Sequence, residues 1–274
     1  MDGTSLHKKA YELRIDILEM VYKSKGGHIG GSMSCIDILA ALYWEVMDAE
    51  QIKQKSDNRD FFVLSKGHCA EALYAVLASK GFFDRSELET YAQFDTKLAE
   101  HPSHRLQGVE ISTGALGHGL SVCAGIALGK KRDGKNGTVY TLMGDGEQAE
   151  GSCWEAAISA SKFKLDNLVA IVDRNRLQIS GSTEEVMPLD NLAEKYRAFG
   201  FNVVECDGHS MDELTTALRT RKKDMPTVVI ANTIKGCGSA IIENKAIWHH
   251  AIPNAEQYEQ IKRDLNQKAG KVAE

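Results

Sequence analysis

The chain has 274 residues, of which 43% are hydrophobic and 26% are charged, and its formal net charge at pH 7 is -5. This balance excludes a disordered or fibrous protein, and it gives no basic excess of the kind that nucleic-acid binding needs. The length corresponds to one large domain or two small ones.

The cysteines and the N-terminus indicate the compartment. The six cysteines lie 30 or more residues apart and form no metal or redox spacing, so we expect reduced, structural thiols. Residues 1–14 are polar and carry no apolar signal core, and the longest apolar stretch, about 120–128, is far short of the ~20 residues that span a bilayer. These observations predict a cytoplasmic protein without membrane contact.

The first 60 or so residues are expected to form a helical lead-in. Apolar residues recur with helical spacing over 6–21, and the glycine-rich turn at 26–31 ends this pattern. His28 is therefore expected in a loop. A second helix should follow, with Ser34 and Asp37 as its capping pair.

Strand and helix patterns alternate along the rest of the chain. Short apolar runs rich in β-branched residues predict strands at 61–64, 139–143, 168–172, 202–205 and 227–231. Helical patterns lie at 70–79, 120–131, 153–163, 191–199 and 211–222. This order predicts an α/β fold, a parallel sheet with helices on both faces. We expect a single domain over 1–274 with a short mobile tail near 268–274.

Two polar segments follow neighbouring predicted strands. Asp145 lies between Gly144 and Gly146, and Asn175 comes 30 residues later, which is the length of one helix, one strand and their loops. Ligands of such sheets bind beyond the carboxyl ends of the strands. Carboxylate and amide oxygens suit Mg²⁺, and the glycines allow a phosphate to approach the backbone. An Asp-Gly pair alone more often marks a plain turn, but this spacing predicts a metal-bridged diphosphate.

These segments resemble the thiamine diphosphate-binding motif, and the whole chain resembles the N-terminal, diphosphate-binding part of transketolases. The resemblance covers about 20–250 and rests on segments that occur in the family's order: 26–31, 63–68, 112–119, 144–151, 173–181 and 233–236. It implies the thiamine diphosphate-binding fold.

The resemblance also implies roles for individual residues. Asp145 and Asn175 would bind a divalent metal, Mg²⁺ or alternatively Ca²⁺ or Mn²⁺, through their side chains, and Leu177 through its carbonyl oxygen. His28, His101 and His249 match catalytic histidines. The implied cofactor-binding residues are His68, Gly114, Ala115, Leu116, Gly146, Glu147, Glu150, Asn175 and His249, of which Glu150 matches an acidic interface residue.

Histidines have a physical rationale at such a site. Cleavage of a carbon–carbon bond beside a carbonyl needs several proton donors and acceptors near neutral pH. Taken singly, each histidine is more simply a surface or capping residue, but their joint occurrence in matched motifs favours the site. The remaining histidines have weaker claims, and His7 is expected in solvent. Three residues depart from the family pattern: His118 replaces a common glutamine, Glu100 a small residue and His250 a glycine.

A full transketolase continues with two further domains, one of which carries the glutamate that contacts the cofactor's pyrimidine ring. We therefore expect the N-terminal subunit of a two-subunit transketolase, active only with a separate partner chain in an α2β2 heterotetramer. It would transfer a two-carbon ketol unit from a ketose phosphate, or a related sugar, to an aldose.

Two alternatives remain open. One is another split thiamine enzyme, either 1-deoxyxylulose-phosphate-synthase-like or a 2-oxo acid decarboxylase subunit, although the histidine set argues against a decarboxylase. The other is a non-catalytic cofactor-binding module, which the presence of Asp145, Asn175 and the histidines disfavours. The tail of the ketose is not readable from this chain, because the residues expected to bind it belong to the partner.

Overall fold

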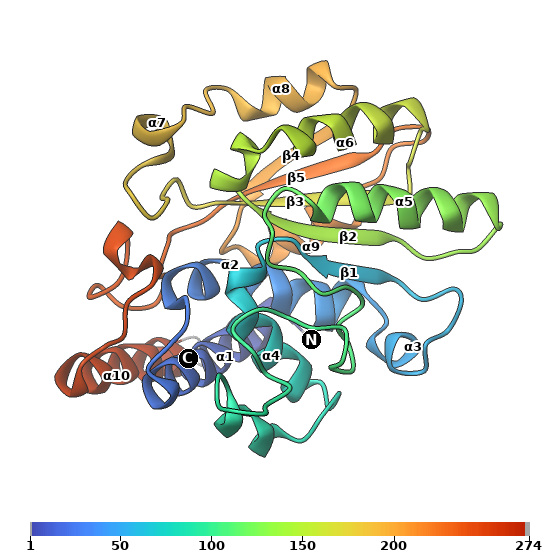
Figure 1. The fold of residues 1–274 in the computed structure, drawn as a ribbon. Coiled ribbons are helices and arrows are strands. Elements are labelled where there is room, and N and C mark those ends of the chain that lie inside the picture. Colours follow the sequence, from blue (N-terminus) through green and yellow to red (C-terminus); the bar gives the residue numbers. More distant parts are fainter. Residues whose placement is uncertain (1, 272–274) are drawn as a thin grey trace.

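The computed structural model describes residues 2–271, and its centre is a five-stranded sheet (Figure 1). All strands are parallel, in the order β1-β2-β3-β5-β4. They are β1 (Phe61–Leu64), β2 (Val139–Gly144), β3 (Leu168–Arg174), β4 (Asn202–Asp207) and β5 (Thr227–Asn232). The predicted strands and the predicted α/β class are thus confirmed, and the strands that differ extend one or two residues further at their carboxyl ends.

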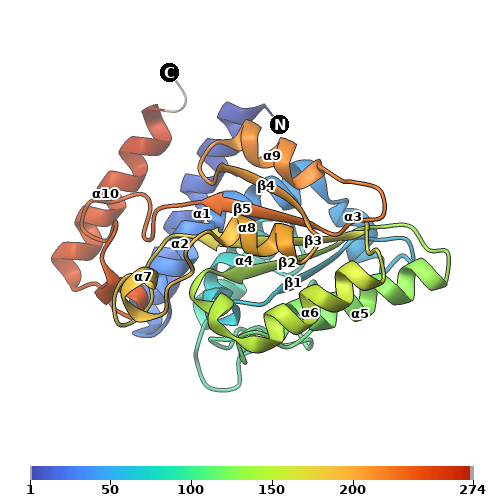
Figure 2. The ribbon, with the colours of Figure 1, turned by 90° about the horizontal axis from the view of Figure 1, so that it is seen from above.

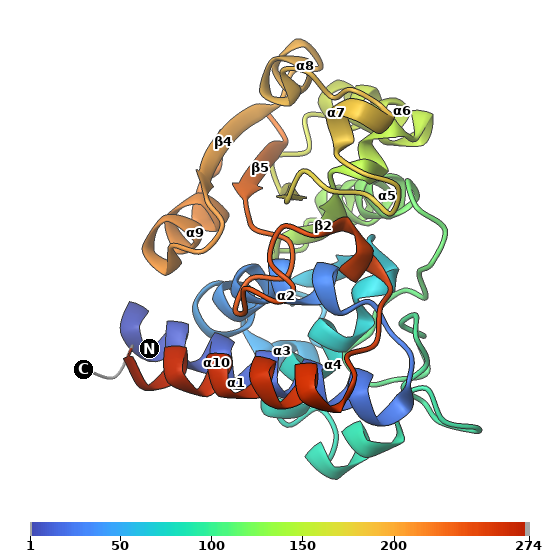
Figure 3. The same ribbon diagram turned by 90° about the vertical axis from the view of Figure 1, so that its left-hand side faces the viewer.

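Helices cover both faces of the sheet, as expected for buried parallel strands. One face packs against α5 (Gly119–Arg132), α6 (Gly151–Lys162) and α8 (Leu192–Ala198). The other packs against α1 (Gly3–Ser24), α2 (Ile29–Ala41), α4 (Ala70–Ser79) and α9 (Met211–Arg219). Successive strand residues alternate between the two cores, so that Leu142 faces one and Met143 the other. Figure 3 shows these layers from the side.

Helix α2 begins earlier than the sequence predicts, and the predicted capping pair is wrong. Ser34 and Asp37 lie inside the helix. Ser34 Oγ donates to the Gly31 carbonyl at 2.9 Å and to Asp173 Oδ2 at 2.6 Å. Asp37 forms a buried ion pair with Arg14 on α1, at 2.5 Å. Both polar side chains therefore serve tertiary contacts.

The glycines at the start of α2 allow close packing. A Cβ atom at Gly30 would lie 2.5 Å from the Trp248 carbonyl oxygen, and one at Gly31 would lie 2.7 Å from Cys69 Sγ. Of the glycines in this turn, Gly27, at φ +122°, is the one that needs glycine for its backbone conformation. His28 occupies the N-cap position between the turn and the helix.

The C-terminal segment is a helix packed on α1, and the predicted mobile tail is wrong over 268–271. Helix α10 runs from Ala255 to Lys271, and the last three residues lie outside the described part of the chain. The rings of Tyr22 and Tyr258 stack at 4.1 Å, and Tyr258 donates to Glu19 at 2.5 Å. Figure 2 shows α10 alongside α1.

Short elements complete the chain and lie mainly in the connections between strands and helices. They are the π-turn η1 (Leu42–Val46), α3 (Ala49–Lys53), η2 (Gly67–Cys69), η3 (Arg85–Thr90), η4 (Gly146–Ala149), α7 (Thr183–Val186) and η5 (Ala246–His249). Of these, η2 and η4 directly follow strands β1 and β2 and so bring their residues to the carboxyl edge of the sheet.

One helical stretch, Ile29–Val46, is long and apolar enough to cross a membrane by length and composition. The expectation that 120–128 is the longest apolar run overlooked this stretch. The core helix of a globular protein passes the same test, and 83% of Ile29–Val46 is buried inside the protein. The stretch is therefore weak evidence for a membrane span.

Candidate active site

The predicted metal ligands lie at one edge of the sheet, after neighbouring strands. Gly144 pairs with Asp173 in the β2–β3 register, which places Asp145 beside the end of β3. The Asp145 carboxylate is buried and accepts from the backbone of Arg176 at 2.5 Å and of Gly146 at 2.8 Å. Burial, and then the nearby Asp173, raise the pKa of Asp145. Arg174 Nη1, 3.3 Å from Asp145 Oδ2, offsets part of this effect, and a metal cation would offset it further.

The side chain of Asn175 is oriented by its neighbours. Its Nδ2 donates to Asp173 Oδ2 and to Ser34 Oγ, both at 3.2 Å. Its Oδ1 accepts from the backbone of Leu177 at 3.1 Å and is the oxygen available to a cation. With the Asp145 carboxylate and the Leu177 carbonyl, this gives an all-oxygen donor set of the kind that Mg²⁺ prefers.

A buried ion pair lies beneath these oxygens. Lys66 Nζ is 2.5 Å from Asp173 Oδ2, and both side chains are 2% exposed or less. Thr233 also donates to Asp173. Burial lowers the pKa of Lys66 and Asp173 raises it, and the carboxylate dominates, so the amine stays charged. Lys66 lies within a segment that carries the family resemblance, but no role was predicted for it.

Lys235 is a second residue of the site that sequence reasoning missed. Its Nζ is buried, 3.1 Å from the Leu177 carbonyl oxygen and 2.9 Å from His249 Nδ1. Burial, with a smaller contribution from Lys66, lowers the pKa of Lys235 to about 8. Lys235 forms no ion pair within the described part of the chain, so an anionic ligand would stabilise its charge. The only signal in the sequence was the position of Lys235 inside a matched motif.

The four histidines singled out from the sequence lie together around His28. The centroid of the His28 ring is 5.3 Å from His68, 6.1 Å from His101 and 5.6 Å from His249. Burial is the main reason that the pKa of His28 falls to about 4 and that of His249 to about 3. Both rings are therefore neutral at pH 7 and can accept as well as donate hydrogen bonds.

A buried glutamate fixes the backbone at His28. Glu71 on α4 is fully buried, and its Oε1 accepts from the His28 backbone at 2.6 Å and from the Tyr91 hydroxyl at 2.7 Å. Its Oε2 accepts from Ser32 Oγ at 2.7 Å. An acid in an otherwise apolar helix was the signal that could have identified this positioning residue.

The positions of the remaining histidines differ in part from those expected from the sequence. His250 joins the cluster, with its ring 4.7 Å from that of His28. His7 stacks on Tyr11 at 5.3 Å and is half-buried, so the prediction that it is solvated is wrong. His249 ends the short helix η5. Three others bind elsewhere: His104 to Ser112, His118 to Leu116 and His209 to Asp37.

The predicted cofactor loop reaches this cluster. Gly114 and Ala115 are exposed and Leu116 is half-buried. A Cβ atom at Gly114 would lie 3.4 Å from the His101 ring, and one at Gly67 would lie 3.0 Å from the Gly114 nitrogen. The loop therefore packs directly against two of the histidine-bearing segments.

The acidic residues predicted to bind the cofactor differ in exposure. Glu147 is buried, and its carboxylate accepts from Ser65 Oγ and from the backbones of Gly117, at 2.8 Å, and Gly144, at 3.0 Å. Glu147 thereby connects the predicted cofactor loop to the end of strand β2. Glu150 is exposed at the start of α6, as a residue that contacts another chain would be.

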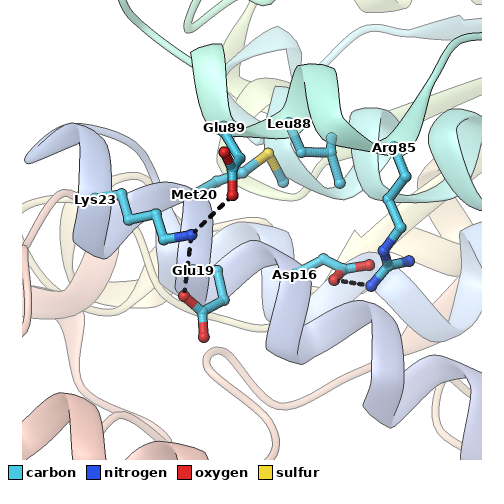
Figure 4. A pocket seen from close by; sticks show the side chains of 7 residues that line it. All are labelled: Asp16, Glu19, Met20, Lys23, Arg85, Leu88 and Glu89. Carbon is cyan, nitrogen blue, oxygen red and sulfur yellow. Dashed lines mark hydrogen bonds and ion pairs between the residues drawn. The ribbon is translucent and has the colours of Figure 1, made fainter.

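A hollow between α1 and η3 contains none of the predicted residues (Figure 4). Its volume is about 180 Å³, and ion pairs line it, Asp16 with Arg85 and Lys23 with Glu89. It offers no histidine and no glycine-rich backbone, so the sheet edge is the better candidate site.

Comparison with known proteins decides the family. Residues 6–272 match the family model described as "Transketolase, thiamine diphosphate binding domain". The chain belongs to the transketolase family. It is 46% identical to one subunit of the apulose-4-phosphate transketolase of Phocaeicola vulgatus, over 99% of this chain and 98% of that protein. It is 42% identical to 6-deoxy-6-sulfo-D-fructose transketolase subunit SqwG of Clostridium sp. (strain MSTE9), over 89% of this chain and 90% of that protein.

Full-length transketolases are similar over only part of their length. The human enzyme is 39% identical over 89% of this chain and 39% of its own. The crystal structure of Campylobacter jejuni transketolase superposes with a TM-score of 0.88 at 30% identity, over 98% of this chain and 43% of that one. The matches of this chain to the relatives that are named as single subunits, in contrast, cover 90% or more of those proteins.

The residues present fit thiamine diphosphate. The edge offers an oxygen donor set for a divalent metal, the buried Lys235 amine for the diphosphate charge, and exposed backbone at Gly114 and Ala115. His28 Nδ1 is buried and has no partner among the described residues, so it lacks a hydrogen bond that a bound molecule could provide.

Proposed function

We propose that this chain is the cofactor-binding subunit of a two-subunit transketolase. The enzyme transfers a two-carbon ketol unit from a ketose to an aldose, with thiamine diphosphate and Mg²⁺ as cofactors. The observation that carries this proposal is the gathering of His28, His68, His101 and His249 beside the oxygen donors at the sheet edge.

Different residues of this chain would bind the metal and the diphosphate. Asp145, Asn175 and the Leu177 carbonyl would hold the metal, which would supply positive charge for the diphosphate. Lys235 would donate to the same anion, and its contact with His249 Nδ1 at 2.9 Å orients that ring. The Lys235 amine and the metal held by the hard oxygen ligands would together offset the diphosphate charge.

The histidines act on the sugar. When bound, thiamine diphosphate supplies the electron sink for the two-carbon unit. His28, His101 and His249 hydrogen-bond the hydroxyls and carbonyl oxygen of the ketose and move protons as the carbon–carbon bond breaks. Neutral rings suit this task, because each presents one donor and one acceptor nitrogen.

A partner chain completes this site. Relatives that this chain matches along nearly their whole length are named as subunits of a transketolase, which supports a separate second chain. That chain would carry the pyrimidine-binding domain and its glutamate in an α2β2 assembly, and two α/β domains require about 300 residues. The six free cysteines, five of them buried, fit the reducing cytoplasm that we propose as its location.

The names of two relatives indicate the class of substrate. They are named for apulose 4-phosphate and for 6-deoxy-6-sulfo-D-fructose, both sugars that carry an anionic group. We therefore place the donor of this enzyme among ketoses with a phosphate or sulfonate tail.

The decisive experiment mixes this chain with the candidate second chain. With Mg²⁺, thiamine diphosphate and an aldose acceptor, the pair should transfer the two-carbon unit from apulose 4-phosphate, 6-deoxy-6-sulfofructose or a simple ketose phosphate to the acceptor and release the shortened carbonyl product. Each chain alone should be inactive. Full activity and cofactor saturation of this chain alone would refute the two-subunit proposal. Decarboxylation of a 2-oxo acid by the pair would indicate the alternative thiamine enzyme, and cofactor binding without turnover would indicate a non-catalytic module.

A further inference from the structure

Two side chains that the proposed reaction does not use converge on His28. They are Glu100, in the loop after η3, and His250, which follows η5. His250 Nε2 lies 4.0 Å from Glu100 Oε2, and the rings of His28 and His250 are 4.7 Å apart. One ligating atom from each of the three residues lies within 4.8 Å of the others. Segments far apart in sequence thus bring two imidazoles and a carboxylate to one point.

The position of His28 is fixed, and one of its nitrogens lacks a partner. Glu71 holds the His28 backbone, and Nδ1 is buried without a hydrogen bond in the described part of the chain. The Glu100 carboxylate lies beside the turn that carries His28, because a Cβ atom at Gly26 would lie 2.8 Å from Glu100 Oε1. A buried nitrogen without a partner is unfavourable unless a ligand satisfies it.

An ordinary ion pair does not explain this arrangement. At 4.0 Å, Glu100 and His250 are at the outer limit of an ion pair, and both side chains are more than a third exposed, so their attraction contributes little. Neither Glu100 nor His250 provides a site by itself, whereas together with His28 they provide three ligands.

We propose that His28, Glu100 and His250 form a second metal site, which takes a borderline-soft divalent cation of the zinc class. Two histidines and a glutamate are a known donor set for Zn²⁺, with the remaining positions open to water or substrate. The site at Asp145, Asn175 and Leu177 is different, because it offers only hard oxygens and suits Mg²⁺.

The required adjustment is small. Zinc bonds of about 2.0–2.2 Å bring tetrahedral ligand atoms to about 3.4 Å from one another. Glu100 and His250 are partly exposed and have room to close this gap, while His28 stays in place. A metal bound here takes the histidine nitrogen that the ketose needs, so zinc inhibits the enzyme in competition with the ketose.

Binding is measured first on the full chain, saturated with Mg²⁺. Zn²⁺ is titrated against a chromogenic chelator, and Co²⁺ serves as the spectroscopic probe of imidazole ligation. We expect one Zn²⁺ per chain, with affinity at least tenfold weaker in Glu100→Gln and in His250→Asn. The matched controls are His104→Asn and Glu259→Gln, which alter exposed residues outside the cluster and should bind as the parent chain does. Melting temperatures confirm that every variant is folded.

Several outcomes would overturn the site: no zinc bound beyond the Mg²⁺ site, zinc lost on Asp145→Asn and retained in the Glu100 and His250 variants, or equal affinity in all variants. This assay needs neither partner nor turnover, so it stands apart from the proposed function. If ketol transfer is established, Zn²⁺ should raise the KM for the ketose, and Glu100→Gln should relieve the effect at least tenfold. Inhibition that is unchanged in this variant would contradict the link to His28.

Discussion

The amine of Lys235 lies 2.9 Å from Nδ1 of His249 and 3.1 Å from the carbonyl oxygen of Leu177. One buried side chain therefore connects the histidine cluster to the predicted metal ligands. In the proposed site, this side chain would keep the substrate end and the diphosphate end in a fixed relative position.

Replacement of this lysine tests that connection. Lys235→Met keeps the length of the side chain and removes its charge, so thiamine diphosphate affinity in the assembled enzyme should fall about 10- to 100-fold, the effect of one charged hydrogen bond of about 1.5–3 kcal/mol. Isothermal titration with the cofactor measures this. Lys223→Met, on an exposed lysine, is the control. Unchanged affinity in the Lys235 variant would mean that the amine serves only the apo fold.

The metal assignment depends on the charge of Asp145. Asp145→Asn keeps the shape of the side chain and removes the charge of a buried carboxylate that Arg174 compensates only in part. Mg²⁺-dependent cofactor binding should be lost, while the melting temperature of the apo chain should change little. Calorimetry with and without Mg²⁺ checks both parts, with Asp133→Asn on the surface for comparison. Parent-like affinity in the presence of Mg²⁺ would exclude Asp145 as a ligand.

A substitution of His28 should affect turnover much more than stability. His28→Ala should lower turnover with the partner by ~10²-fold or more, the scale of a lost proton-transfer or polar contact in the transition state. Stability should fall by no more than about 0.5 kcal/mol, because the Glu71 contact is to the His28 backbone and survives. Steady-state kinetics and thermal melting measure the two effects. Full activity with a much lower melting temperature would make the residue structural.

Asp37 is predicted to stabilise the fold. Its carboxylate accepts from both terminal nitrogens of the buried Arg14 and contacts His209 Nδ1 at 2.6 Å. Asp37→Asn leaves the Arg14 charge without its partner and should lower the free energy of unfolding by about 3–5 kcal/mol at pH 7. Urea denaturation measures this, with Asp133→Asn as the surface control.

The pH dependence of that loss has a definite sign. Burial opposes ionisation of Asp37, but Arg14 outweighs it and holds the pKa of Asp37 well below its usual value of 3.8. The stabilisation is thus fully present above pH 3.8 and is lost as the pH falls further, toward the pKa of the folded state. The difference between parent and variant should shrink in that window. A difference that is constant down to low pH would show that the charge of Asp37 is not responsible.

Local sequence patterns were enough to predict the sheet and the place of the site. Apolar runs such as 168–172 and 227–231 are local signals for buried strands, and all the predicted strands formed. The spacing from Asp145 to Asn175 predicted neighbouring strand ends, because a helix crossover returns the chain to the same edge. The four singled-out histidines met there as well, since their motifs lie in connections at this end.

Contacts between elements that are far apart in sequence determined which other residues join the candidate site. Lys66, Glu71 and Lys235 are charged groups whose burial depends on contacts between elements far apart in sequence, and no local pattern records those contacts. Helix α2 starts at Ile29 because Gly30 fits beneath Trp248, whereas a local rule placed the cap at Ser34. The contact between His250 and His28 likewise depends on tertiary packing and has no local sequence signal. Hydrophobic periodicity fixes elements residue by residue, but the contacts of a polar side chain depend on where the whole chain places its neighbours.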